Sequence, residues 1–585
     1  MEGELAGGFG WVDWAVVIGL FALTTAVGER AAGKQASLRD FFLGGRKLPW
    51  YAVAASIVAT EISAVTFISL PSVVWKPGGN LAYLQIGLIG SLLAKAIIGY
   101  VLVPAYYERE IYSPYDYMGA RLGGRVRGTA TALFTLGGVI GQSARVYVTA
   151  VVLEVILQRE LGWVAAQAGI PPLVAAVAAI GLVAVAWTWI GGIAIVIWTD
   201  AILFVLFLVG IAIALLTAAA HVDGGLLEAL RSGADAGKLR ILDASLDPTR
   251  AYTFWAALIA STWGMVGSYG TDQLVAQRLF TCKGARDARR AILASYAAVI
   301  VTCLVALVGV GLWAYYREHP LSGAGLELVS AKPDRVFPVF IVEVIPTGLK
   351  GLVLAGAFAA AISSLDSILA ALSQTTVSAV WVPWRRRRGR PMGEAESLRV
   401  SRSLVVGWAL VLCAAAVGID RVAADYDSIL DLALAVASYT GGALIAGFFL
   451  AFLPLRIDGR GFSWSAPLSV LTIFAVTSHQ EWAATLGLSP PALCLWAGVV
   501  GLLLWIALRV RTDRSAGVSS ARLAVQTVAL AAGFLLTWWI ARDLWWPGAD
   551  GARRVLAWPW YLPLGSVVAF LYGWLLARPR SPESA

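Results

Sequence analysis

The chain has 585 residues, of which 59% are hydrophobic and 14% are charged, and its formal net charge is +9. Because soluble domains carry about a quarter charged residues, this composition excludes an ordinary soluble protein and indicates a polytopic membrane protein. The four cysteines and three histidines are widely scattered, which predicts neither a disulfide framework nor a metal cluster.

About fifteen apolar stretches are long enough to cross a bilayer, and short polar segments separate them. Every second segment is rich in arginine and lysine, and the strongest run is Arg385–Arg388. Basic short loops stay in the cytoplasm, so the pattern predicts an external N-terminus and a cytoplasmic C-terminus in the cell (inner) membrane. We interpret the arginine run as a topology anchor against anionic lipid headgroups, not as a nucleic-acid site.

The first polar feature lies in the apolar segment 48–71, whose middle carries Thr60, Glu61, Ser63 and Thr66. A carboxylate at mid-membrane depth costs several kcal/mol, so it is rarely left there without a partner. Hydroxyls and the carbonyl groups of an interrupted helix are such partners in transporters that bind a small cation. The alternative is that Glu61 lies near a helix end or faces an internal water pocket.

Arg145 stands inside the long apolar stretch 125–157, and Gln85 lies in the stretch before it. An arginine at this depth needs an anionic partner or a wet cavity, and its planar guanidinium suits a carboxylate. Either an internal acid such as Glu61 or the carboxylate of a substrate satisfies this need. The sequence does not decide between them.

Asp200 follows Trp198 and Thr199 and comes shortly after Gly191-Gly192. The hydropathy pattern predicts that it opens an apolar helix from the cytoplasmic side. There it either caps the helix N-terminus or contributes to a cation site.

A further polar group is predicted on one helix face, because Ser363, Asp366 and Ser367 stand at i, i+3 and i+4. Ser364 lies next to them and Ala360 is one turn earlier. Converging oxygen ligands in apolar surroundings suit a hard cation such as sodium. The alternative is a helix-packing seam of small residues, but a carboxylate does not serve packing.

Several separated motifs complete the pattern over roughly residues 10–455. They are Phe42-Leu43-Gly44-Gly45-Arg46, Ala55-Ser56 with Ile62-Ser63, Gly191-Gly192 with Trp198-Thr199-Asp200, Thr271-Asp272-Gln273-Leu274-Val275-Ala276-Gln277-Arg278, Ser363-Ser364-Leu365-Asp366-Ser367, and Ser438-Tyr439-Thr440-Gly441-Gly442. Together they resemble the sodium/solute symporter family, which includes sodium/glucose, proline and sialic acid cotransporters.

The resemblance implies an all-α polytopic membrane protein of the LeuT type, with two inverted repeats of five helices. One extra helix would precede the repeats and about four would follow them. The first helix of each repeat would be broken, near 57–66 and near 262–270. The implied regions are an N-terminal helix and loop, two repeats and additional C-terminal helices, at 1–49, 50–220, 252–454 and 455–585 respectively.

By the same resemblance, a common sodium site would use carbonyl groups near Ala59, Ile62 and Ala360 and the hydroxyls of Ser363 and Ser364.

A second sodium site, present in some branches, would involve Asp200, Ser363, Asp366 and Ser367. Asp366 stands where those branches usually carry a hydroxyl. The extra charge would either strengthen cation binding or be neutralised by a proton.

Ser63, Thr66, Gln85 and Arg145 resemble positions that hold the substrate in the sialic-acid branch. Glu61 departs from the sugar branch, which has an amide there, whereas proline permeases carry an acid. The resemblance therefore favours an acidic sugar or another organic anion as the substrate.

These observations predict a sodium-coupled symporter that imports a small organic solute by alternating access, with sodium as its only inorganic ligand and no other cofactor. Alternative substrates are a neutral sugar or an amino acid. A non-transport membrane sensor on the same fold is an alternative of a different class. An enzyme is not expected, because the histidines lie at loops or at the ends of apolar stretches and form no catalytic pair.

Overall fold

A computed structural model of the chain describes residues 8–32, 38–62, 64–109, 111, 113–389, 393–423, 429–477, 487, 489–510, 518–543, 546–547 and 553–579. Ten helices in this part are long and apolar enough to cross a membrane, and one bent helix pair makes an eleventh span. Two shorter apolar helices, Ser438–Phe452 and Phe462–Thr477, add to these, and the apolar segment Leu349–Phe358 extends the helix of the span Leu365–Arg387. Together they account for most of the roughly fifteen stretches predicted from hydropathy.

The N-terminal half is helical throughout its described residues. Its elements are α1 (Trp11–Ala32), α2 (Leu38–Leu43), η1 (Gly44–Arg46), α3 (Trp50–Glu61), α4 (Ala64–Trp75), η2 (Leu81–Tyr83), η3 (Ile86–Ser91), α5 (Leu92–Ile97), η4 (Ile98–Leu102), α6 (Val103–Glu108), α7 (Pro114–Leu122), α8 (Gly124–Ile156), α9 (Gln158–Ala168), α10 (Pro172–Ala220) and α11 (Gly225–Asp235).

The middle of the chain forms a second helical set. Its elements are η5 (Ala256–Ser261), α12 (Thr262–Val266), η6 (Gly267–Thr271), α13 (Gln273–Phe280), α14 (Ala285–Ala294), η7 (Ser295–Ala297), α15 (Ala298–Glu318), α16 (Gly323–Ala331), η8 (Pro333–Arg335), α17 (Val336–Glu343), α18 (Leu349–Thr376), η9 (Val377–Trp381), α19 (Val382–Arg387), α20 (Glu394–Ala423) and α21 (Ile429–Phe452).

The C-terminal region adds further helices and one short antiparallel strand pair. Its elements are α22 (Phe462–Thr477), α24 (Pro490–Leu504), η10 (Trp505–Val510), α26 (Ser520–Asp543), β1 (Trp546–Pro547), β2 (Arg553–Arg554), η11 (Trp558–Trp560) and α27 (Tyr561–Leu575).

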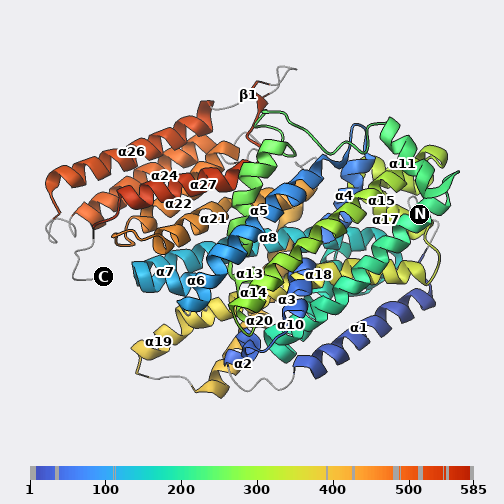
Figure 1. The fold of residues 1–585 in the computed structure, drawn as a ribbon, viewed down its shortest axis with the longest axis horizontal. Helices are drawn as coiled ribbons and strands as arrows, with labels where there is room; N and C mark the ends of the chain where they lie inside the picture. Colours follow the sequence, from blue (N-terminus) through green and yellow to red (C-terminus); the bar gives the residue numbers. More distant parts are fainter. Residues whose placement is uncertain are drawn as a thin grey trace.

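The helices form one bundle with additions on opposite sides (Figure 1). In its interior α10 packs against α18 more extensively than any other pair of described helices. α1 lies along these two helices at one edge. The C-terminal helices gather at the other edge, where α27 packs against both α21 and α22. Functional side chains on α10 and α18 are therefore held in the interior of the bundle.

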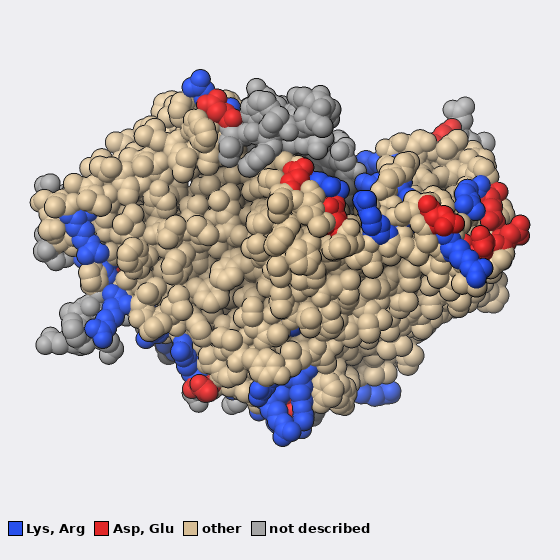
Figure 2. Space-filling model, turned by 45° about the horizontal axis from the view of Figure 1, so that its top comes forward, with Lys and Arg blue, Asp and Glu red and all other residues tan. Residues whose placement is uncertain are grey.

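The charged residues mark the borders of an apolar belt. Figure 2 shows a wide face without lysine, arginine or acidic side chains, and charged groups gather along its edges. Large exposed hydrophobic side chains on many helices, such as Leu182, Leu410 and Val528, are consistent with contact to lipid. The structure therefore supports the multi-pass membrane class derived from composition.

Two helix breaks decide where polar residues fall. In α10, Gly192 has φ 56° and ψ −152°, and a Cβ there would lie 2.4 Å from the carbonyl oxygen of Phe41, so only glycine fits. This break divides α10 into the spans Pro172–Trp189 and Gly192–Ala220. The apolar stretch 337–382 is divided in the same way, because α17 and α18 are separated by a turn at Gly348 with φ 86°.

Candidate substrate and cation sites

The first interrupted helix is the pair α3 and α4. Helix α3 ends at Glu61, Ile62 is extended with φ −90° and ψ 90°, and the axes of Trp50–Glu61 and Thr66–Trp75 differ by 52°. A helix end leaves its last carbonyl groups without helical partners, which makes them available to a ligand. Ala59 belongs to this last turn. Ser63 lies outside the described residues.

The second interruption is at Asp272, slightly beyond the predicted segment 262–270. Wide π-type turns form η5 and η6, and Asp272 itself is extended with φ −82° and ψ 137°. Its Oδ1 accepts a hydrogen bond from the backbone N–H of Leu274 at 2.8 Å and so caps α13. The side chain of Asp272 thus starts a new helix at the edge of a cavity.

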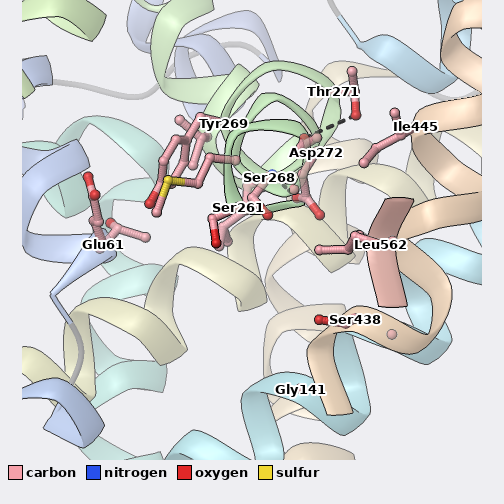
Figure 3. A pocket seen from close by; sticks show the side chains of 18 of the residues that line it. Glu61, Gly141, Ser261, Ser268, Tyr269, Thr271, Asp272, Ser438, Ile445 and Leu562 are labelled. Carbon is pink, nitrogen blue, oxygen red and sulfur yellow. Dashed lines mark hydrogen bonds between the residues drawn. The ribbon is translucent and has the colours of Figure 1, made fainter. Parts of the chain in front are cut away.

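The two interruptions meet at a cavity of about 270 Å³ (Figure 3). Thr60, Glu61, Ile62 and Thr66 line it from the first broken helix. The second broken helix, α8 and α21 supply much of the remaining wall, together with Leu562 of α27. The wall residues from these elements include Gln142, Arg145, Ser261, Ser268, Tyr269, Asp272, Ser438 and Thr440. The cavity is therefore largely apolar with a few converging polar groups, as in small-molecule sites.

Glu61 is held by a lysine, not by Arg145. The Nζ of Lys95 on α5 lies 2.7 Å from Oε2 of Glu61 and donates a second hydrogen bond to the carbonyl oxygen of Ser295 at 2.8 Å. Lys95 is buried, and its ammonium stands 5.3 Å from the ring centre of Tyr269. Lys95 is therefore the counter-ion of Glu61, and no acid of the described residues forms an ion pair with Arg145.

Arg145 and Gln85, predicted together, lie in different surroundings. Arg145 lines the cavity, with Asp272 as the acid in its electrostatic environment. Gln85 is not part of the cavity wall. Its Nε2 donates to the carbonyl oxygen of Tyr252 at 3.2 Å, and its Oε1 accepts from the N–H of Asp243 at 3.3 Å. In this conformation Gln85 fastens the chain that leads into the second broken helix.

A second polar cluster is buried where α3, α10, α13 and α18 meet. Asp200 and Arg278 form an ion pair with Nη2 and Oδ2 3.1 Å apart, and both side chains have 0% exposure. Ser56 bridges them: its hydroxyl donates to Asp200 at 2.6 Å and accepts from Nε of Arg278 at 2.8 Å. Arg278 also donates to the hydroxyl of Ser367. Of the two alternatives for Asp200, the helix cap is wrong, because the helix begins earlier, at Gly192, and carries Asp200 into the interior.

Asp366 joins this cluster, which then holds two acids and one base. Its carboxylate is fully buried and interacts electrostatically with both Asp200 and Arg278. Ser363 lies beside Asp200 on the same side. Three buried oxygens have no hydrogen bond of good geometry within the described chain: Asp200 Oδ1, Asp366 Oδ2 and Ser363 Oγ. Carboxylate and hydroxyl oxygens of this kind fit a hard cation such as sodium. The side chains of Ala360 and Ser364 lie outside the described residues.

Sequence reasoning missed Lys95 and Arg278 as site residues. Lys95 stands in an apolar stretch, so the rule that singled out Arg145 applies to it equally. Arg278 belongs to a motif at the end of a stretch, where a basic residue looks like a topology signal. Its contact with Asp200 depends on the tertiary fold.

Two interrupted helices that meet at a largely apolar cavity with a few polar groups, inside a membrane bundle, are typical of a secondary transporter. The comparisons identify the family: the model of the sodium:solute symporter family matches residues 41–466, and the chain belongs to this family. It is therefore a sodium-coupled symporter of a small organic solute, and sodium is its coupling ion.

Two relatives and one solved structure illustrate the likeness. Sodium-coupled monocarboxylate transporter 2 of Mus musculus is 28% identical over 456 residues, which cover 77% of this chain and 69% of that protein. The sodium/sialic acid symporter SiaT of Proteus mirabilis is 27% identical over 479 residues, covering 80% of this chain and 90% of the relative. The substrate-bound outward-open structure of a Na⁺-coupled sialic acid symporter aligns with a TM-score of 0.71 and 22% identity, covering 98% of this chain and 99% of that one. The predicted fold class, family and coupling ion are confirmed.

Proposed function

We propose that this symporter imports a small organic anion and that Arg145 binds the carboxylate of that anion. The observation that carries the proposal is the position of Arg145 in the cavity wall while Glu61 is neutralised by Lys95. A guanidinium in a largely apolar cavity gains most from a bidentate carboxylate. Relatives named for sialic acid and for monocarboxylates transport such anions.

An acidic sugar of the sialic-acid type is our first choice of substrate. Thr66 at the first helix break, together with Ser261 and Ser438, offers hydroxyl groups around the cavity for a polyhydroxylated molecule. Glu61 and Ser63 complete the proposed substrate set, whereas Gln85, predicted with them, supports the chain beside the cavity. A smaller monocarboxylate is the second choice, and a neutral sugar or an amino acid would need a different anchor from Arg145.

Sodium is proposed to bind first at the end of α3, using carbonyl groups of Ala59, Ile62 and Ala360 and the hydroxyls of Ser363 and Ser364. A second sodium ion is proposed between Asp200, Asp366 and Ser367, where two acids share one base and two carboxylate oxygens have no hydrogen bond of good geometry within the described chain. Both sites join α18 to α3 or α10, so sodium would favour the conformation in which these helices are close. Coupling follows if the substrate favours the same conformation.

The transport direction and orientation complete the proposal. The chain lies in the cell (inner) membrane with its N-terminus outside and its C-terminus in the cytoplasm, as the basic loops indicate. It imports its substrate by alternating access and performs no chemical reaction. The regions 1–49, 50–220, 252–454 and 455–585 are the proposed structural divisions.

The test is a sodium-dependent thermal-shift screen of purified protein with sialic acid, propionate, glucose and proline, followed by uptake in proteoliposomes. Anions should raise Tm only with sodium present. Arg145→Lys should raise the KM of the anion by roughly 10- to 100-fold, since bonds to charged groups contribute about 1.5–3 kcal/mol. Sodium binding without substrate should change little.

Arg125→Lys is the matched control, because Arg125 is an exposed arginine on the same helix, α8. Transport of a neutral solute that is equally good in the wild type and in Arg145→Lys would contradict the anion proposal. If no solute raises Tm in the presence of sodium, the result would favour a sensor on the same fold.

A further inference from the structure

One wall of the cavity comes from outside the part of the chain that matches the family. Trp558, Pro559 and Leu562 line the cavity, whereas the family match ends at residue 466. These residues belong to η11 and to the first turn of α27. The part of the chain that matches the family model therefore does not supply this wall.

The first turns of this helix lie at the cavity. η11 runs directly into α27, so the two elements form one helical stretch over residues 558–575. Trp558, Pro559 and Leu562 come from the beginning of that stretch.

Glycines allow Leu562 to sit between the second broken helix and α21. A Cβ at Gly264 of α12 would lie 3.0 Å from Cδ1 of Leu562, and one at Gly441 of α21 only 2.5 Å from Cδ2. A Cβ at Gly442 would lie 2.7 Å from the carbonyl oxygen of Leu562. Figure 3 shows the Leu562 side chain extending from α27 towards Asp272. The leucine thus occupies space at the cavity wall that larger residues on α12 or α21 would fill.

Two hydrogen bonds fix the beginning of α27 in this place. Trp263 Nε1 on α12 donates to the hydroxyl of Ser566 at 2.9 Å. The N–H of Ala557 donates to the carbonyl oxygen of Pro248, in the loop between α11 and η5, at 3.0 Å. The wall is therefore attached to the second broken helix and to the loop that leads into it.

We propose that Leu562, together with Trp558, sets the size limit for the substrate of this symporter. The inference rests on the proposed function of the cavity. The far end of a substrate bound at Arg145 meets the other walls of the cavity, and these walls limit its size. Leu562 forms the part of the wall that the C-terminal region supplies. The appended helices would then contribute to selectivity, beyond supporting the bundle.

The experiment compares a bulky and a small carboxylate, sialic acid and propionate, in proteoliposomes. Leu562→Ala enlarges the cavity and should raise the kcat/KM ratio of sialic acid to propionate by about tenfold, as expected when a pocket gains a few methylene volumes. Leu562→Met keeps the volume and should leave the ratio near the wild-type value. Sodium affinity measured without substrate should remain within about twofold.

Leu571→Ala is the matched control, because Leu571 lies on the same helix and is 55% exposed. If the wild-type screen selects neutral sugars over acids, the anion proposal fails, and the same size test is run with glucose and the smaller sugar xylose. A changed size ratio would then still support the role of Leu562. An unchanged ratio in Leu562→Ala, for whichever pair the wild type transports, overturns it.

A second measurement covers the case in which Leu562→Ala folds poorly. Leu562→Cys is labelled with a small maleimide in sodium, with and without the solute selected by the wild-type screen. Bound solute should slow the labelling at least fivefold if the side chain lines the occupied cavity. Equal labelling rates with and without solute would place Leu562 away from the substrate and contradict the inference.

Discussion

The structure holds two groups of charged side chains that differ in their balance, one at the cavity wall and one fully buried. At the cavity, Glu61 and Lys95 form a pair of one acid and one base, and Lys95 is further held by the carbonyl oxygen of Ser295. In the second cluster, one base, Arg278, faces two acids, Asp200 and Asp366. The first group has its charges matched within the protein, and the second does not.

The difference indicates which group needs an ion. A matched acid–base pair is stabilised by mutual attraction and hydrogen bonds, although the cost of desolvating the two charges offsets much of this stabilisation. An excess carboxylate in a dry interior costs several kcal/mol unless a cation or a proton reaches it. We therefore expect sodium to affect the stability of the Asp200–Arg278–Asp366 cluster strongly and that of the Glu61–Lys95 pair little.

The largest effect should follow Arg278→Ala. The change removes the only base of the cluster among the described residues and leaves two carboxylates buried, which should lower the free energy of unfolding by about 3–5 kcal/mol. High sodium should recover part of the loss, because cations then compensate the carboxylates. Thermal unfolding in detergent across a sodium series measures both effects.

The exposed Arg286 provides the control, and its replacement by alanine should change Tm little. If Arg278→Ala is as stable as the wild type in sodium-free buffer, the two acids do not depend on Arg278. The cluster then carries no unbalanced charge that sodium has to compensate.

The second effect concerns the matched pair. Lys95→Met alone leaves Glu61 without its base and should cost about 3–5 kcal/mol, whereas Lys95→Met with Glu61→Gln should recover most of this loss. Unlike the loss in Arg278→Ala, the loss in Lys95→Met should not respond specifically to sodium. Unfolding of the single and double variants, at equal ionic strength in sodium and in choline, separates the two behaviours.

The surface pair Arg290–Asp287, with 49% and 26% of the side chains exposed, is the control cycle and should show a coupling of at most about 1 kcal/mol. Rescue of Lys95→Met by sodium but not by choline would show that the matched pair also takes part in cation binding.

The sequence was sufficient for one part of this comparison. Composition and the polar positions Glu61, Arg145 and Asp366 already indicated a membrane transporter with buried charges. The partners were not predictable, since Ser56 reaches Asp200 and Lys95 reaches Glu61 only after the helices pack. Tertiary packing, not local pattern, decides such pairs.

Two further differences between the sequence-based predictions and the structure concern where a helix begins and which surroundings an apolar residue faces. Asp200 was expected at a helix start because apolar residues follow it, but the strained turn at Gly192 begins the helix earlier. Leu562 gave no signal, since an apolar residue in an apolar helix looks the same whether it faces lipid or a cavity.

A smaller effect is expected for Asp366→Ser, which removes the excess charge and restores a hydroxyl. Sodium affinity should fall by about tenfold, equivalent to about 1.4 kcal/mol. Protons compete with sodium for a carboxylate, so wild-type affinity should fall as pH is lowered from about 8 to 5, and the variant should lose this dependence. Sodium titrations followed by tryptophan fluorescence at several pH values measure both.

Asp366→Asn keeps the shape without the charge and should also flatten the pH profile. Matching pH profiles in the wild type and Asp366→Ser would mean that Asp366 does not belong to a cation site.

The smallest change removes one neutral oxygen, in Ser363→Ala. The Ser363 hydroxyl is buried, has no hydrogen bond of good geometry within the described chain and lies beside Asp200, so it is available to a cation. Because no protein partner loses a hydrogen bond, the fold should keep its stability without sodium, while sodium-driven uptake should weaken sharply. Ser373 is the matched control on the same helix, since its hydroxyl already donates a hydrogen bond to the carbonyl oxygen of Ser401. Ser373→Ala should therefore lower stability by about 1 kcal/mol and leave sodium affinity unchanged. If Ser363→Ala is unstable but has normal sodium affinity, Ser363 is a packing residue. A cation that balances the two acids would then be bound without the Ser363 hydroxyl.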